Sequence, residues 1–382
     1  MRQTSLRHEP AKEKTSWQFF VLLLVFVGTP LAPAAWSEEI PTQSKVILSD
    51  VYTIDRKYPS MRGPYGVQEV QLGEAGSPSE LLWVTGYRAV MVGPDGESAA
   101  SQEFMCHSNL DIDMERHRDL FQWKKQVSTR LFTLSQGQFD ITFPAGFGLP
   151  IFSDEVFSLN TQVLNHNIEG HTFQVRHKIA IDYVRAADLK TPLKPLFMAA
   201  ATGLVLLEGQ GEQGENAYFN VGNPDAEDHG PGCLIGLGAT QHTYTDAFGR
   251  KFTGHWTVKP GREVNRTLAT TWMQLPFDTT VHYIGVHLHP FAESLELRDL
   301  TTGKTVFQSK VRGTPEAIGI EHVEYFSSPE GLSVYKGHEY ELVSTYNNTT
   351  DVDQDSMAVM FLYLLDKELQ KTNLAHTLPP LF

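Results

Sequence analysis

Residues 172–181, TFQVRHKIAI, alternate between large apolar or aromatic side chains and polar or small ones. Because every second side chain of a strand lies on the same face, this alternation predicts a β-strand with one buried face. Residues 281–289, VHYIGVHLH, are apolar on both faces and predict a buried strand. Residues 295–300 and 305–308 flank the turn sequence TTGK and predict a hairpin.

The strand patterns continue toward the end of the chain. Residues 340–346 and 357–365 are further β candidates, although the continuous apolar run 357–365 also fits a short helix. Convincing amphipathic helices are scarce, and residues 115–127 are the best helical candidate. Many short strands with Gly and Pro turns predict an all-β protein of β-sandwich or jelly-roll architecture.

The length of 382 residues exceeds one average domain and predicts two. Residues 186–195 carry several charges and two prolines, as is typical of a connection between β domains. We therefore expect an N-terminal domain at residues 45–190 and a C-terminal domain at residues 191–370. A glycine-rich stretch predicts an irregular insert in the second domain, near residues 208–256.

The N-terminal segment predicts export. Basic residues precede the short apolar run 19–28, and small residues follow it. This run is too short to span a bilayer, which takes about 20 residues. Residues 1–36 are therefore expected to be a signal peptide, with an uncleaved anchor as the alternative. We expect a secreted or periplasmic protein that has no membrane segment after cleavage.

Composition excludes several classes of function. The 45 acidic residues exceed the 31 basic ones and give a formal charge of −14. A chain this acidic is repelled by phosphate backbones, so no nucleic-acid partner is expected. Two cysteines are too few for a disulfide scaffold or a cysteine-rich zinc module.

The sequence His287-Leu288-His289 is the first candidate for chemistry. Residues i and i+2 of a strand point to one face, so both imidazoles can reach one metal ion. The same pattern also occurs without a metal, and a structural role stays open. A cupin is a competing metal fold because Glu293 follows, but the glycines of that motif are misplaced and no second cupin motif appears.

Met357 is the second candidate. A methionine in an apolar strand is ordinarily part of a core. Together with His287 and His289 it favours copper, because a soft thioether stabilises Cu(I). His107 and His166 are a further pair that could share a second metal site.

The order of these residues resembles the copper type II, ascorbate-dependent monooxygenases, the family of peptidylglycine α-hydroxylating monooxygenase and dopamine β-monooxygenase. The resemblance covers roughly residues 45–367 and implies two jelly-roll β-sandwich domains in tandem, with one copper in each. In the C-terminal domain it implies that His287, His289 and Met357 bind the oxygen-activating copper. In the N-terminal domain it matches residues 106–107 to the family's adjacent histidine pair and His166 to its later histidine.

The implied activity is oxidoreductase chemistry: hydroxylation of a C–H bond of a small substrate by O2. The copper near His107 and His166 would relay an electron, with ascorbate or a similar small molecule as reductant. The expected partners are thus a small-molecule substrate and a reductant. A non-catalytic copper-binding or copper-delivery protein on the same fold is the main alternative, and a metal-free adhesion or scaffold protein is the third.

The sequence departs from the family at several positions. Cys106 stands where the family has the first histidine of its pair, and its thiolate could bind copper or form a disulfide bond with Cys233. Gly285 and Phe361 stand where the peptide-amidating members hold the substrate carboxylate. A peptide ending in glycine is therefore not the expected substrate. The insert, which contains His255, has no family equivalent.

Overall fold

A computed structural model describes residues 41–125, 127–207, 239–240 and 243–371. The predicted signal peptide, Cys233 and most of the predicted insert lie outside these residues. All of the described residues belong to one compact unit. No helix among the described residues is long and apolar enough to cross a membrane.

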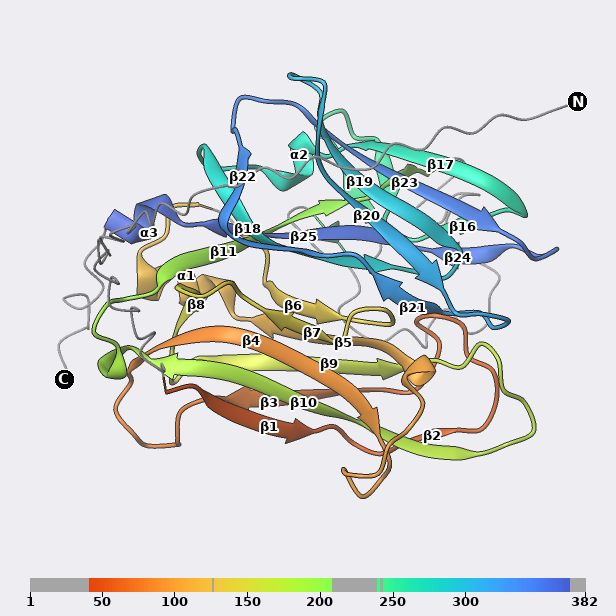
Figure 1. The fold of residues 1–382 in the computed structure, drawn as a ribbon, viewed down its shortest axis with the longest axis horizontal. Coiled ribbons are helices and arrows are strands. Elements are labelled where there is room, and N and C mark those ends of the chain that lie inside the picture. Colours follow the sequence, from red (N-terminus) through yellow and green to blue (C-terminus); the bar gives the residue numbers. More distant parts are fainter. Residues whose placement is uncertain (1–40, 126, 208–238, 241–242, 372–382) are drawn as a thin grey trace, which may run out of the picture. The chain divides into compact units, whose positions relative to one another are not determined.

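The fold is all-β, as predicted, and Figure 1 shows its strands. The elements of the first half are β1 (Gln43–Leu48), β2 (Tyr52–Ile54), β3 (Tyr65–Gln71), β4 (Leu81–Val92), η1 (Gln102–Phe104), β5 (Met105–Ile112), α1 (Met114–Phe121), β6 (Arg130–Leu134), β7 (Asp140–Thr142), β8 (Phe147–Phe152), β9 (Val156–Val163), β10 (Phe173–Arg185) and η2 (Ala186–Asp188). Those of the second half are β11 (Lys194–Thr202), β12 (Val205–Leu206), β13 (Ala239–Thr240), β14 (Thr243–Thr245), β15 (Lys251–Thr253), β16 (Trp256–Val258), β17 (Gly261–Leu268), α2 (Thr270–Met273), β18 (Thr279–Leu288), β19 (Ala292–Asp299), β20 (Lys304–Gly313), β21 (Ile320–Val323), β22 (Phe326–Val334), β23 (Tyr340–Asn348), β24 (Gln354–Ser356), β25 (Ala358–Leu365) and α3 (Lys367–Lys371).

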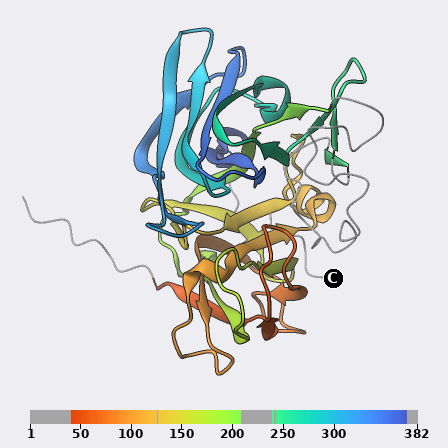
Figure 2. The ribbon, with the colours of Figure 1, turned by 90° about the vertical axis from the view of Figure 1, so that its right-hand side faces the viewer.

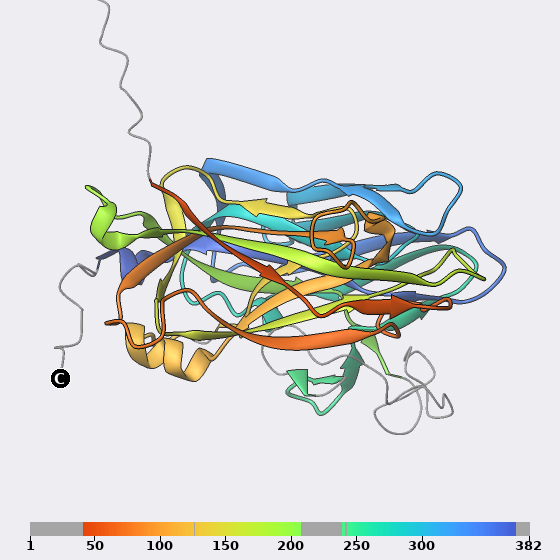
Figure 3. The same cartoon turned by 90° about the horizontal axis from the view of Figure 1, so that it is seen from below.

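One ten-stranded sheet runs through both halves. Eight of its strands follow the order β1-β10-β4-β8-β11-β25-β18-β22, while β2 pairs with β10 and β7 pairs with β4. The halves meet at the parallel pair β8 and β11, where Lys194 lies opposite Phe147. Seen from below, β10 and β4 lie side by side in the first half (Figure 3). The predicted boundary at residue 190 falls just before β11, but the sheet is continuous across it.

Two further sheets enclose two hydrophobic cores. The sheet β3-β9-β5-β6 covers the first core, and the sheet β17-β23-β19-β20-β21 covers the second. In Figure 2 the strands of the second half, in green to blue, lie mainly above those of the first half, in orange and yellow. The first core is built mainly from residues before position 190 and the second mainly from residues after it, but residues of the second half also enter the first core.

The strands β11, β25 and β18 are shared by both cores. Met357, Val359 and Phe361 pack into the first core, whereas Ala358 and Met360 pack into the second. Figure 1 shows these strands lying between the upper sheet, with β19 and β23, and the lower sheet, with β5 and β9. A strand with both faces buried needs apolar residues at every position, which explains the continuous apolar run of β25. The helical alternative for residues 357–365 is wrong.

Most other sequence predictions of elements are confirmed. The stretch 172–181 lies in β10, residues 281–289 coincide with β18, and the predicted hairpin is β19 and β20. The predicted helix 115–127 is shorter than expected. Asp113 caps the start of α1, which ends where Gln122 adopts a left-handed conformation. The described end of the predicted irregular insert is partly regular, because β13, β14 and β15 form a small sheet with β12.

The turn of residues 135–138, SQGQ, joins the two halves. Ser135 and Gln138 exchange backbone hydrogen bonds that close the turn after β6. Gln138 Oε1 accepts from the Val286 N–H at 3.0 Å, and its Nε2 donates to the Tyr283 hydroxyl at 2.9 Å. Gln136 Oε1 accepts from the Ile320 N–H at 3.1 Å. The bonds from the Val286 and Ile320 N–H groups satisfy backbone donors of the second half, and the bond to Tyr283 adds a side-chain contact.

Gly137 fills a position in this turn that suits no other residue. Its φ is +84°, and a Cβ there would lie 2.5 Å from the Ile320 Cγ2. We expect Gly137→Ala to lower the free energy of unfolding by about 3 kcal/mol, because left-handed strain and overpacking add.

Gly76 is the matched control, with a φ of +83° and no atom within 4 Å of its added Cβ. Gly76→Ala should cost only about 1 kcal/mol, from strain alone. Urea unfolding of both variants measures the difference. Equal losses would show that the contact with Ile320 contributes nothing.

Candidate metal centre

The His287 and His289 rings lie together at the end of β18. Their centroids are 5.3 Å apart at an interplanar angle of 89°, and both residues are buried. Residues 287 and 289 share the strand face that looks toward the first core. The imidazoles are thus close neighbours in an environment largely shielded from water.

Each ring is oriented through its Nδ1 atom. His287 Nδ1 makes a hydrogen bond of 2.9 Å with the Ser135 Oγ, whereas His289 Nδ1 lies 2.6 Å from the Asp355 Oδ2 in a close polar contact whose angles are not those of a hydrogen bond. The Nε2 atoms make no hydrogen bond to any residue within the described ranges. Metal-binding histidines characteristically have this arrangement, with one nitrogen held by a polar partner and the other left for the metal.

Asp355 stands at the centre of the polar cluster. Burial acts to raise its pKa, but the interactions with His289, His166 and His255 outweigh burial and hold the pKa at about 2. Asp355 lies on β24, which pairs with β16. A buried carboxylate held in its charged form among imidazoles attracts a cation.

His255 and His166 complete this cluster. The His255 ring precedes β16 and lies 5.2 Å from the His289 ring, centroid to centroid. His166 is largely buried, and its Nε2 has no hydrogen-bond partner among the described residues. Burial lowers the pKa of His166, while Asp355 opposes that shift.

His107 lies on β5, opposite Gln162 of β9. Burial lowers its pKa to about 3, with a further contribution from the Arg130 charge. Burial also holds the pKa of His287 well below its usual value. Both imidazoles are therefore neutral at physiological pH, the form in which a ring nitrogen can bind a metal.

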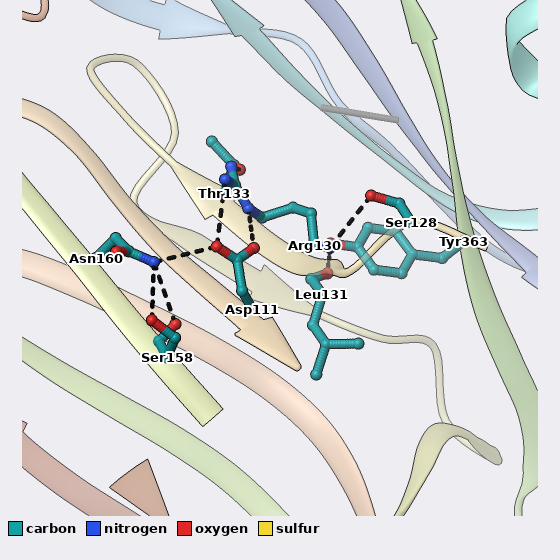
Figure 4. A network of polar contacts seen from close by, with 8 residues as sticks. All are labelled: Asp111, Ser128, Arg130, Leu131, Thr133, Ser158, Asn160 and Tyr363. Atoms are coloured by element: carbon teal, nitrogen blue, oxygen red, sulfur yellow. Dashed lines mark hydrogen bonds and ion pairs between the residues drawn. The ribbon is translucent and has the colours of Figure 1, made fainter. Parts of the chain in front are cut away.

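Arg130 is held by a network on the neighbouring strands (Figure 4). Its guanidinium pairs with Asp111 and donates to Thr133 at 2.8 Å. Asp111 also accepts from Asn160 Nδ2 at 3.1 Å. The network fixes a positive charge that acts on both His107 and His287.

Cys106 carries a free, buried thiol in the structure. It lies at an irregularity between β5 and β9, packs with Met61 and Leu164, and accepts from the Met61 N–H at 3.5 Å. Burial raises its pKa to about 12, so the thiol stays protonated. Cys233, the other cysteine considered for a disulfide with Cys106, lies outside the described residues.

Met357 is buried in the first core. Its carbonyl accepts from the His289 N–H at 3.3 Å and from the Tyr346 hydroxyl at 2.6 Å. This bond continues the β18–β25 register, in which Leu288 lies opposite Ala358. Met357 and His289 are thus cross-strand neighbours, whose Cβ atoms are expected about 5 Å apart.

The described residues contain no three His, Cys, Asp or Glu side chains placed to hold one metal ion. The set His287, His289 and Met357 nevertheless fits copper by its chemistry, because two imidazoles lie together and the residue opposite His289 carries a thioether. The N-terminal set of Cys106, His107 and His166 fits less well. His166 interacts with Asp355 and His289, while the Cys106 thiol is enclosed by apolar side chains.

Sequence reasoning missed three groups of this cluster. Asp355 had a signal, since it lies in the acidic segment just before Met357. His255 was noticed only as part of the insert. Ser135 had no signal in the sequence, because 152 residues separate it from His287.

Comparison with known proteins adds little to this description. No protein-family model and no curated protein matches the chain. Among solved structures, one titled "Crystal Structure of the STIV MCP" matches with a TM-score of 0.29 and 7% identity. The match covers 85% of this chain and 99% of that one. A likeness this weak carries no argument about function.

The buried state of Cys106 predicts its reactivity. In the native protein, iodoacetamide should leave Cys106 unmodified for hours, because the thiol is enclosed and protonated. In denaturant the same residue should react fully. Peptide mass spectrometry locates the label, and rapid native labelling or a disulfide at Cys106 would contradict the expectation.

The Arg130–Asp111 pair predicts a stability effect. Asp111→Asn should lower the free energy of unfolding by about 3 kcal/mol, because it leaves a buried guanidinium without its countercharge. Asp182→Asn is the control, since its partner Arg88 is half exposed, and should cost less than about 1 kcal/mol. Similar losses in urea unfolding would show that Asp111 has no special role.

Proposed function

We propose that this chain is an exported copper-binding protein of monooxygenase type, which holds copper at His287 and His289 with Met357 as the third ligand. The observation that carries the proposal is the orientation of the two imidazoles. Ser135 and Asp355 hold their Nδ1 atoms, and the two Nε2 atoms make no bond within the described chain. The export signal proposed for residues 1–36 places the protein in the periplasm or outside the cell.

The chain's own residues would prepare the site for the metal. Ser135 and Asp355 fix the rings, and Asp355 adds a negative charge that offsets the charge of the ion. Arg130 favours the neutral form of His287. The surrounding core limits the access of water. Copper, when bound, supplies O2 activation and one-electron transfer from ascorbate or a similar reductant.

The substrate would differ from a peptide carboxylate. Gly285 lies directly opposite Phe361 on β25, and both belong to the packed interior. A Cβ on Gly285 would meet the Gln138 amide at 3.6 Å. This position offers no charged group to a carboxylate, which supports a small, less charged substrate.

A copper-binding or copper-delivery protein without catalysis is the second candidate. The enclosed, protonated thiol of Cys106 favours it, because a second copper near His107 would lack that ligand. The two candidates share the site at His287 and His289 and differ in turnover.

Metal content and oxygen uptake test the proposal. The mature protein reconstituted with copper should retain the metal after desalting, and His289→Ala should lose it. His171→Ala is the matched control, since this exposed histidine lies outside the cluster and should retain copper. A wild-type protein that binds no copper would refute the proposal.

Met357→Ile separates the two candidates. The substitution keeps an apolar side chain of similar size, so the free energy of unfolding should change by less than about 1.5 kcal/mol. Loss of the thioether should abolish ascorbate-driven oxygen uptake if the protein is a monooxygenase. Copper binding without oxygen uptake in the wild type would favour the delivery protein.

A further inference from the structure

The hydroxyl that orients His287 comes from the other half of the chain. Ser135 lies in the turn after β6, its Oγ is 2.9 Å from the His287 Nδ1, and both residues are buried. Asp355, which orients His289, belongs instead to the same half as the histidines. The two imidazoles are therefore held by partners from different halves.

The place of the Ser135 hydroxyl depends on how the turn is docked. Gln138 bonds to Val286, one residue before His287, and to Tyr283 on the same strand. Gly137 accepts through its carbonyl from the Val323 N–H at 3.2 Å. Bonds on both sides of the turn thus fix the serine against β18, and neither Gln138 nor Gly137 provides an atom to the imidazoles.

We propose that Ser135 is a positioning residue for metal binding at His287, and that docking of the 135–138 turn is thermodynamically coupled to that binding. This inference rests on the proposed copper site. A hydroxyl that accepts from Nδ1–H selects the tautomer whose Nε2 lone pair faces the metal. Without the hydroxyl, the ring loses both its tautomer preference and one restraint on its rotation.

Reciprocity follows from the coupling. If the docked turn favours metal binding, bound metal must favour the docked turn by the same factor. Metal should then stabilise the contact between the halves, and loosening that contact should weaken the metal site. A residue distant from the metal, such as Gln138, would thereby influence its affinity.

The test uses Cu(II) bound to the mature full chain. Ser135→Ala should weaken copper affinity, measured by competition with a chelator, by about 10- to 100-fold. It should also change the nitrogen hyperfine pattern in the electron paramagnetic resonance spectrum. Ser135→Thr, which keeps the hydroxyl, should restore both. Ser108→Ala is the matched control, because it removes a buried hydroxyl bonded to Tyr87 at 2.6 Å in the first core, and should leave both readouts unchanged.

Gln138→Ala tests the coupling itself. It should lower copper affinity and reduce the rise in melting temperature on adding copper.

Wild-type affinity and spectrum in both Ser135→Ala and Gln138→Ala would overturn the inference while leaving the copper site intact. No copper binding by the wild type would overturn the proposed function and this inference with it. If Ser135→Ala does not fold, the copper affinities of Ser135→Thr and Ser135→Val are compared instead, because these side chains have similar shapes and only threonine carries a hydroxyl. Equal copper affinities of the two variants would overturn the role of the hydroxyl.

Discussion

Strand β18 runs past the end of its neighbour β22, and the backbone groups left unpaired there must find partners. The last residue of β18 that pairs with β22 is Ile284. Beyond it, Gln138 accepts the Val286 N–H, and Ser135 meets the His287 ring. A buried N–H without a partner would cost about 1–3 kcal/mol, so the turn from the first half stabilises the second half by satisfying these groups. The candidate site depends on this same contact.

The buried charge of Asp355 also bears on what the cluster can bind. Asp355 is charged and buried, and the groups that lower its pKa are the imidazoles of His289, His166 and His255. Burial lowers the pKa of one of these imidazoles, His166, so that ring gives the carboxylate little positive charge in return. A cation held at the site would compensate it. This imbalance is the main physical reason to regard the cluster as more than a set of core histidines.

Local patterns in the sequence predicted the strands well, because alternation and apolar runs report burial directly. Residues 172–181 and 281–289 are examples, and the hairpin after Asp299 followed from its turn. The helix 115–127 was predicted too long, since α1 ends where the Gln122 backbone adopts a left-handed conformation. His287 and His289 were found because they are close in sequence. Ser135 was not, because a contact across 152 residues leaves no local pattern.

Strand β25 is the last strand among the described residues, and it contributes side chains to both hydrophobic cores. Until it has been synthesised, neither core can close, however early the first 190 residues leave the ribosome. The nascent chain therefore cannot complete either core until almost its whole length is available, so its two halves must finish folding together.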